Sequence, residues 1–204
     1  HGQRASRTAS RKLEELVKKD QVISDYQAVF RELNQSVCRE GKKYHSMIGS
    51  TAAILFLKEG CGTAVNVGDS RIYQFHKKQL IQLSEDHTEY AMMLALKQTL
   101  SHTENIDLST VNSNILTQYL GIPEEEFLLE PKIREINEIA SGDIFLLCSD
   151  GLWGSVPDYR ITELLSSDNT LDEIAVGLKE EAYRAGGKDN ITMILLRIGK
   201  EESL

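Results

Sequence analysis

The stretch GDIFLLCSDGLWG, residues 142–154, carries most of the sequence information about the fold. Its middle, from Ile144 to Ser149, is mostly apolar and rich in residues that favour strands, which predicts a buried strand. Asp150 and Gly151 follow that strand at once. A carboxylate beside an apolar core is costly unless a cation or hydrogen-bond donors meet it. We therefore expect a partner for Asp150, and a metal ion is one candidate.

The length, composition and net charge of the sequence limit the class of protein. The chain has 204 residues, 41% apolar and 26% charged, which is ordinary for one globular domain. Its 23 Lys and Arg against 31 Asp and Glu give a net charge of −8, which argues against a nucleic-acid partner. No apolar run approaches the roughly 18 residues of a membrane helix, so we expect no membrane partner and see no signal peptide.

Cysteine usage indicates the compartment. Cys38, Cys61 and Cys148 are far apart and show no CxxC spacing. A thiolate zinc site and a disulfide scaffold are therefore not expected. A reducing, cytoplasmic location fits these three cysteines best.

The hydrophobic period changes along the chain. Amphipathic helices are expected over 5–19 and from about 23 to 41. Four β-rich segments follow, at 50–57, 62–68, 71–76 and 79–84, and predict an antiparallel meander. A weak pattern over 86–121 suggests a short helix at 89–98, a mobile excursion and a second short helix. Later strands are expected at 127–136, 143–149 and 190–198, with helices at 158–166 and from Thr170, where Thr170 and Glu173 have capping-box spacing. The class is α+β.

Four acids lie where a strand meets a loop: Asp69 in VNVGDSR, Asp86 in LSEDHT, Asp150 in LLCSDGL and Asp189 in GGKDNIT. If the fold gathers them on one rim, they suit Mg²⁺ or Mn²⁺, which prefer oxygen ligands. Two such ions can activate a water and stabilise an in-line displacement at phosphorus. The alternative is that each acid forms a turn, because Asp beside Gly or Asn caps local backbone groups. The pattern leaves both open, and for Asp69 it favours the turn, with Ser70 and Arg71 as partners.

Six segments, in order and spelling, resemble the metal-dependent protein serine/threonine phosphatases of type 2C, in particular the bacterial members. They are IGSTAAILFL (48–57), AVNVGDSRIYQF (64–75), LSEDHTEYA (83–91), ILTQYLG (115–121), GDIFLLCSDGLWG (142–154) and GGKDNITMILL (186–196). The resemblance implies a β-sandwich of antiparallel sheets flanked by pairs of helices. It also implies hydrolysis of phosphoserine and phosphothreonine in phosphoprotein substrates by a metal-activated water. Two Mn²⁺ or Mg²⁺ ions, room for a third, and an opposing Ser/Thr kinase are part of the same expectation.

The resemblance also assigns roles to residues of this chain. Asp150 and Asp189 correspond to ligands of the second catalytic metal, and Asp86 corresponds to a ligand of the third. Four further residues are expected to support the site: Gly151, Asn190, Asp69 and His87. Residues 87–113 correspond to the flap, a mobile segment beside the metals.

The N-terminal part of the family pattern has no counterpart in this sequence. Members begin with a strand that carries a phosphate-binding Arg, and a second strand ends in Asp-Gly-x-Gly-Gly, whose Asp bridges both catalytic metals. HGQRAS, residues 1–6, resembles the segment directly after that motif. We therefore expect 1–204 to be a single phosphatase domain without its first strands, inactive by itself. Two alternatives stay open: a catalytically incomplete phosphatase-like domain that acts as a binding or regulatory module, and a stress-response phosphatase of a related branch.

Overall fold

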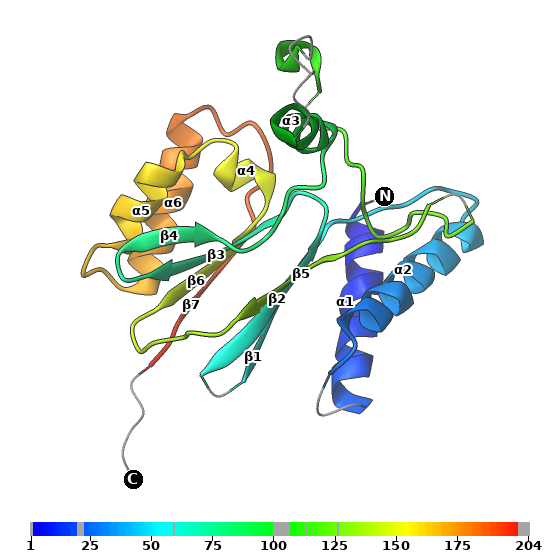
Figure 1. The fold of residues 1–204 in the computed structure, drawn as a ribbon, viewed down its shortest axis with the longest axis horizontal. Coiled ribbons are helices and arrows are strands. Elements are labelled where there is room, and N and C mark those ends of the chain that lie inside the picture. Colours follow the sequence, from blue (N-terminus) through cyan, green and yellow to red (C-terminus); the bar gives the residue numbers. More distant parts are fainter. Residues whose placement is uncertain are drawn as a thin grey trace. The chain divides into compact units, whose positions relative to one another are not determined.

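The computed structural model describes residues 2–19, 23–58, 60–99, 107–112, 114–125 and 127–199. These residues fold as two compact units. The first unit comprises His1–Ala52, Val67–Asp69 and Asp86–Pro131, and the second comprises Ala53–Asn66, Ser70–Glu85 and Lys132–Leu204. Figure 1 labels the helices and strands of both units.

Helices α1 (Gly2–Lys19) and α2 (Tyr26–Lys43) lie side by side in the first unit (Figure 1). Three large apolar residues of α2, Phe30, Leu33 and Val37, and two alanines of α1, Ala5 and Ala9, are buried. The second helix begins at Tyr26 and not near Ile23 as expected. The reason is that the side chain of Asp25 accepts a hydrogen bond from the Ala28 backbone N–H at 2.9 Å, which caps the helix there.

A buried asparagine joins α2 to a later loop of the first unit. Asn34, fully buried, donates to the Ile122 carbonyl at 2.9 Å and accepts from the Gly121 N–H at 2.7 Å. The unit also contains α3 (Glu89–Thr99), which confirms the short helix expected at 89–98, and the 3₁₀ turn η1 (Leu108–Thr110) in place of a second short helix. The expected mobile excursion falls largely on residues 100–106, outside the described residues.

The second unit holds two sheets, apart from one residue of β1 and one of β2. The three-stranded sheet has the order β1-β2-β5, built from β1 (Ala52–Lys58), β2 (Cys61–Val67) and β5 (Lys132–Ile136). The four-stranded sheet has the order β4-β3-β6-β7, built from β3 (Arg71–His76), β4 (Gln79–Gln82), β6 (Ile144–Cys148) and β7 (Met193–Arg197). The pairs β2–β5, β3–β4, β3–β6 and β6–β7 are antiparallel.

Two expectations for the strands are wrong. The first four strands do not form one meander, because β1 and β2 belong to one sheet and β3 and β4 to the other. The chain leaves the first sheet at Gly68, whose φ of 93° lies in the region that favours glycine. The strand expected over 127–136 begins only at Lys132, since Pro131 has no N–H to donate to a ladder.

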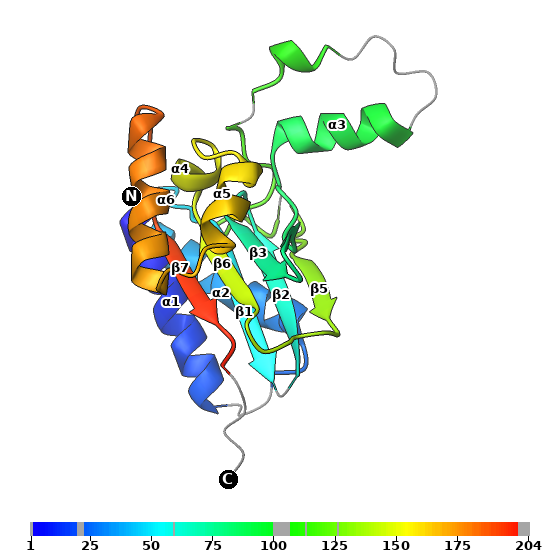
Figure 2. The same ribbon diagram turned by 90° about the vertical axis from the view of Figure 1, so that its left-hand side faces the viewer.

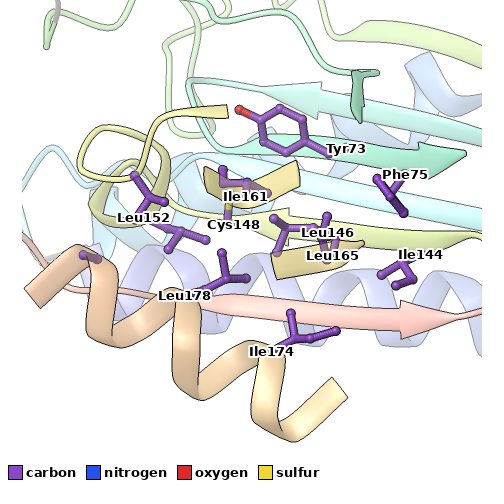
Figure 3. Close-up of a cluster of buried hydrophobic side chains, with 12 residues drawn as sticks. Tyr73, Phe75, Ile144, Leu146, Cys148, Leu152, Ile161, Leu165, Ile174 and Leu178 are labelled. Carbon is purple, nitrogen blue, oxygen red and sulfur yellow. The ribbon is translucent and has the colours of Figure 1, made fainter. Parts of the chain in front are cut away.

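Successive side chains of β3 and β6 point to opposite faces of the four-stranded sheet, so these strands contribute to two separate hydrophobic cores. Tyr73 and Phe75 of β3, with Ile144, Leu146 and Cys148 of β6, pack against α4 (Asp150–Trp153), α5 (Asp158–Leu165) and α6 (Leu171–Arg184), as Figure 3 shows. The neighbours Ile72 and Phe145 point to the other face and pack with Ala64 and Ile136 of the three-stranded sheet. The second unit therefore has three layers, helices on sheet on sheet, with α5 and α6 on the outer face of the four-stranded sheet (Figures 1 and 2). The predicted α+β sandwich of antiparallel sheets is confirmed.

Candidate metal centre

Asp150 stands at the start of the one-turn helix α4, directly beyond β6. The Gly151 backbone N–H donates to its Oδ1 at 2.9 Å, and its own carbonyl accepts from the Gly154 N–H at 2.8 Å. The side chain is half-buried. The stretch that reads as a strand followed by a bare acid is therefore a strand followed by a helical turn, which the sequence pattern did not predict. This turn presents the Asp150 carboxylate at the end of a central strand.

The turn that carries Asp189 lies against the turn that carries Asp150. A β-carbon on Gly151 would lie 2.3 Å from the Asn190 carbonyl oxygen and 3.3 Å from the Asp189 carbonyl carbon, so the two backbones touch. Only glycine permits that approach without a shift of one turn. Asp189 is exposed, and the Asn190 N–H donates to its Oδ1 at 2.6 Å.

Ser149, which directly follows β6, also joins these two turns through hydrogen bonds. Its hydroxyl donates to the Asn190 carbonyl at 3.2 Å and accepts from the Thr192 N–H at 3.0 Å. Its backbone N–H donates to the Thr192 carbonyl, also at 3.0 Å. The sequence feature that could have indicated this role is the position of Ser149, one residue beyond the end of β6 and opposite the start of β7.

Arg71 and Trp153 border the Asp150 turn. The Arg71 guanidinium carbon lies 3.6 Å from the centroid of the Trp153 ring, a cation–π contact between β3 and α4. Arg71 also donates to the Tyr73 hydroxyl at 2.9 Å, and that hydroxyl lies 3.4 Å from Oδ1 of Asp158 at the start of α5. Burial raises the pKa of the Tyr73 hydroxyl well above its usual range, so it stays neutral and can act as a donor. These contacts join α4 and α5 to β3.

The remaining predicted site residues belong to the first unit. Asp69 follows Gly68, and Asp86 precedes His87, and these two turns are joined to each other: the Gly68 N–H donates to His87 Nδ1 at 3.2 Å, and the His87 N–H donates to the Gly68 carbonyl at 3.0 Å. Because Nδ1 accepts, the ring proton of neutral His87 resides on Nε2. Asp69 and Asp86 are each half-buried.

The donor set of the second unit suits one hard cation. In the described ranges, no three His, Cys, Asp or Glu side chains form a group that could hold a metal ion. Asp150 and Asp189 nevertheless supply two carboxylates on touching turns. Mg²⁺ is commonly bound through one or two carboxylates with water at its other positions, and Mn²⁺ takes the same oxygen ligands. These two residues therefore fit one such ion.

Comparisons with known proteins agree on one family. The profile described as "Protein phosphatase 2C" matches residues 2–186. The chain is 29% identical over 186 residues to the serine/threonine phosphatase stp of Listeria monocytogenes, covering 89% of this chain and 70% of that protein. It is 30% identical over 172 residues to the protein phosphatase PhpP of Streptococcus pneumoniae, covering 83% of this chain and 67% of that protein. For a second Listeria monocytogenes relative the chain spans only 56% of its length.

Solved structures show the same fold. The catalytic domain of the serine threonine protein phosphatase PstP, determined with two manganese ions, superposes with a TM-score of 0.78 at 25% identity over 98% of this chain and 82% of that one. A bacterial serine phosphatase gives a TM-score of 0.80 at 26% identity, over 98% of this chain and 82% of that one. With a family profile that spans most of its length and neighbours of this fold, the chain belongs to the protein phosphatase 2C family of bacterial-type serine/threonine protein phosphatases.

Proposed function

We propose that the protein containing this chain removes phosphate from phosphoserine and phosphothreonine in proteins, with Asp150 and Asp189 as ligands of a Mn²⁺ or Mg²⁺ ion. The observation that carries the assignment is the contact between Gly151 and Asn190, which brings the two acidic turns together. The family match supports the reaction class. It does not favour the alternative of a purely binding or regulatory module.

The chain's own residues have separate tasks in this proposal. Asp150 and Asp189 hold the ion, while Gly151 and Asn190 keep their turns in contact. When bound, the metal supplies Lewis-acid stabilisation of the phosphoryl oxygens and a water activated for in-line attack. Asp86 is proposed as a ligand of a third ion. Asp69 and His87 are proposed to shape the turn next to it, because His87 Nδ1 accepts from the Gly68 N–H.

The domain layout, partners and location belong to the same proposal. We assign residues 1–204 to one phosphatase domain with a flap over 87–113, phosphoproteins as substrates and a Ser/Thr kinase as the opposing enzyme. No helix in the described ranges combines the length and the apolar character needed to cross a membrane. Cys38, Cys61 and Cys148 are free thiols, which supports a cytoplasmic location.

The test uses the full-length protein with p-nitrophenyl phosphate. Turnover is expected to require Mn²⁺ or Mg²⁺ and to stop with chelator. Asp150→Ala is expected to lower kcat/KM about 100-fold or more, since even residues that only orient metal ligands cost about 10- to 100-fold. Asp168→Ala, which removes an exposed acid in the loop before α6, is the control and should match wild type.

A second readout does not depend on turnover. Trp153 is the only tryptophan of the 204 residues and lies three residues after Asp150. Mn²⁺ is expected to change its fluorescence in a saturable titration, and Asp150→Ala should abolish that change. Metal-independent turnover, or an Asp150→Ala variant with wild-type activity and titration, would contradict the proposed function.

A further inference from the structure

Helix α1 carries a row of exposed arginines. Arg4, Arg7 and Arg11 are spaced by three and four residues, which places them on one face of the helix. All three are exposed, and no acid precedes Glu14 in the sequence. A concentration of positive charge of this kind stands out in a chain whose net charge is −8.

The charge of this row is not neutralised locally. Two other cations of α1 have acidic partners: Lys12 pairs with Glu32 at 2.7 Å, and Lys18 with Glu14 at 2.6 Å. Among the residues that the structure describes, Arg7 and Arg11 form no ion pair. The first turn of α1 contains no acid, so the positive end of the helix dipole adds to the same field.

An aromatic side chain fixes one end of the row. The Arg4 guanidinium carbon lies 3.6 Å from the centroid of the Tyr44 ring, a residue just beyond α2. The ring is itself half-exposed. The contact orients Arg4 without removing its charge, because the face of an aromatic ring attracts a cation but does not neutralise it. We call Arg4, Arg7, Arg11 and Tyr44 the α1 docking face; all four residues belong to the first unit.

We propose that the α1 docking face binds an acidic segment of the phosphoprotein substrate. The inference rests on the proposed function, which makes the substrate a protein that carries phosphate. Arg4 and Arg11 are separated by about 10 Å along the helix at about 1.5 Å per residue. An extended peptide rises about 3.3 Å per residue, so the face spans an acidic segment of about three or four residues. Its guanidinium groups can each make two parallel hydrogen bonds to a carboxylate or phosphate. A nucleic acid is less well matched, because the acidic remainder of the chain would repel a longer polyanion.

The experiment compares two phosphothreonine peptides of equal length, one with Asp and Glu on both flanks and one with Asn and Gln. Binding to the full-length protein is measured by fluorescence anisotropy in chelator, so that turnover plays no part. Wild type is expected to bind the acidic peptide about five- to ten-fold more tightly, as summed exposed ion pairs allow. The preference should shrink as salt is raised.

The double variant Arg7→Glu/Arg11→Glu is expected to lose the preference for the acidic peptide. Lys58→Glu/Lys179→Glu, the same two charge reversals at exposed positions of β1 and α6, is the matched control and should keep it. A preference that survives the double variant would overturn the inference, and so would stronger competition by single-stranded DNA or anionic vesicles than by the acidic peptide.

Kinetics separate this inference from the proposed function. If wild type hydrolyses both peptides with equal kcat/KM and binds them equally, the docking inference fails while the phosphatase proposal stands. If the acidic peptide binds preferentially but is not hydrolysed with Mn²⁺ or Mg²⁺, the phosphatase proposal fails and the bound acidic segment is not a substrate.

Discussion

At the scale of single residues, Gly151 does more than allow a turn. The space that a side chain would need is taken by the carbonyl of Asn190. There is no room for a β-carbon between the turn that carries Asp150 and the turn that carries Asp189, so the two backbones lie directly against each other. The acid and the glycine that follows it therefore act as one unit.

Gly151→Ala is expected to destabilise the fold by about 1 to 3 kcal/mol, the usual cost of overpacking, since the new methyl group would meet Asn190 backbone at 2.3 Å. The Mn²⁺ concentration that half-saturates the Trp153 fluorescence change should rise as the turns separate. Urea unfolding and the titration measure these effects. Gly199→Ala, where nothing lies within 4 Å, is the control; an equal loss of stability there would refute the explanation.

At the scale of elements, α6 shows a cap that the sequence predicted correctly. The Glu173 N–H donates to Thr170 Oγ1 at 3.3 Å, and the Thr170 N–H donates to Glu173 Oε2 at 2.8 Å. The capping hydrogen bonds also lower the pKa of the Glu173 carboxyl. The cap is local in sequence, which is why spacing alone revealed it. Through Ile174, Leu178 and Ala182, the capped helix covers the outer face of the four-stranded sheet.

Thr170→Ala is expected to cost about 1 kcal/mol of unfolding free energy, because the Glu173 backbone N–H loses the hydroxyl oxygen that accepts its hydrogen bond. Thermal and urea unfolding followed by circular dichroism measure the loss. The matched control is Thr162→Ala in α5, where the hydroxyl donates to a carbonyl four residues earlier and threonine is a weaker helix former than alanine. That variant should be neutral or slightly more stable, and a larger loss there than at Thr170 would contradict the capping role.

At the scale of the whole molecule, the three-layered second unit places Tyr73 in the core that α4, α5 and α6 share (Figure 3). Desolvation raises the pKa of its hydroxyl in the folded state above the ordinary value of about 10. As pH rises, the unfolded chain therefore loses this proton before the folded protein does. The stability that Tyr73 contributes is fully present below about pH 10 and is lost as the pH rises above it.

We expect the urea midpoint to fall as the pH rises above about 10, and to fall less steeply in Tyr73→Phe, which cannot ionise at that position. Tyr73→Phe should also be less stable near neutral pH, because Arg71 and Asp158 lose the hydroxyl between them. Tyr159→Phe alters an exposed hydroxyl and should keep the wild-type slope. Identical slopes for wild type and Tyr73→Phe would show that alkaline unfolding has another origin.

The sequence by itself determined the features that depend on neighbours in the chain. Hydrophobic period placed α1, α2, α3, α5 and most strands to within a few residues but missed α4, and capping chemistry located the start of α6. The order of the motifs identified the family. These features are predictable because a helix, a strand or a cap is specified within about four residues of sequence.

Only the tertiary structure decided which strands share a sheet and which acid-bearing turns lie against each other. The break at Gly68 sends β1 and β2 to one sheet and β3 and β4 to the other, a choice that alternation cannot express. The contact of Gly151 with Asn190, residues far apart in the chain, brings together the turns that carry Asp150 and Asp189. The stacking of Arg71 on Trp153 likewise depends on β3 lying beside β6. Such contacts form between distant segments only when the chain packs around a common core, so no local pattern encodes them.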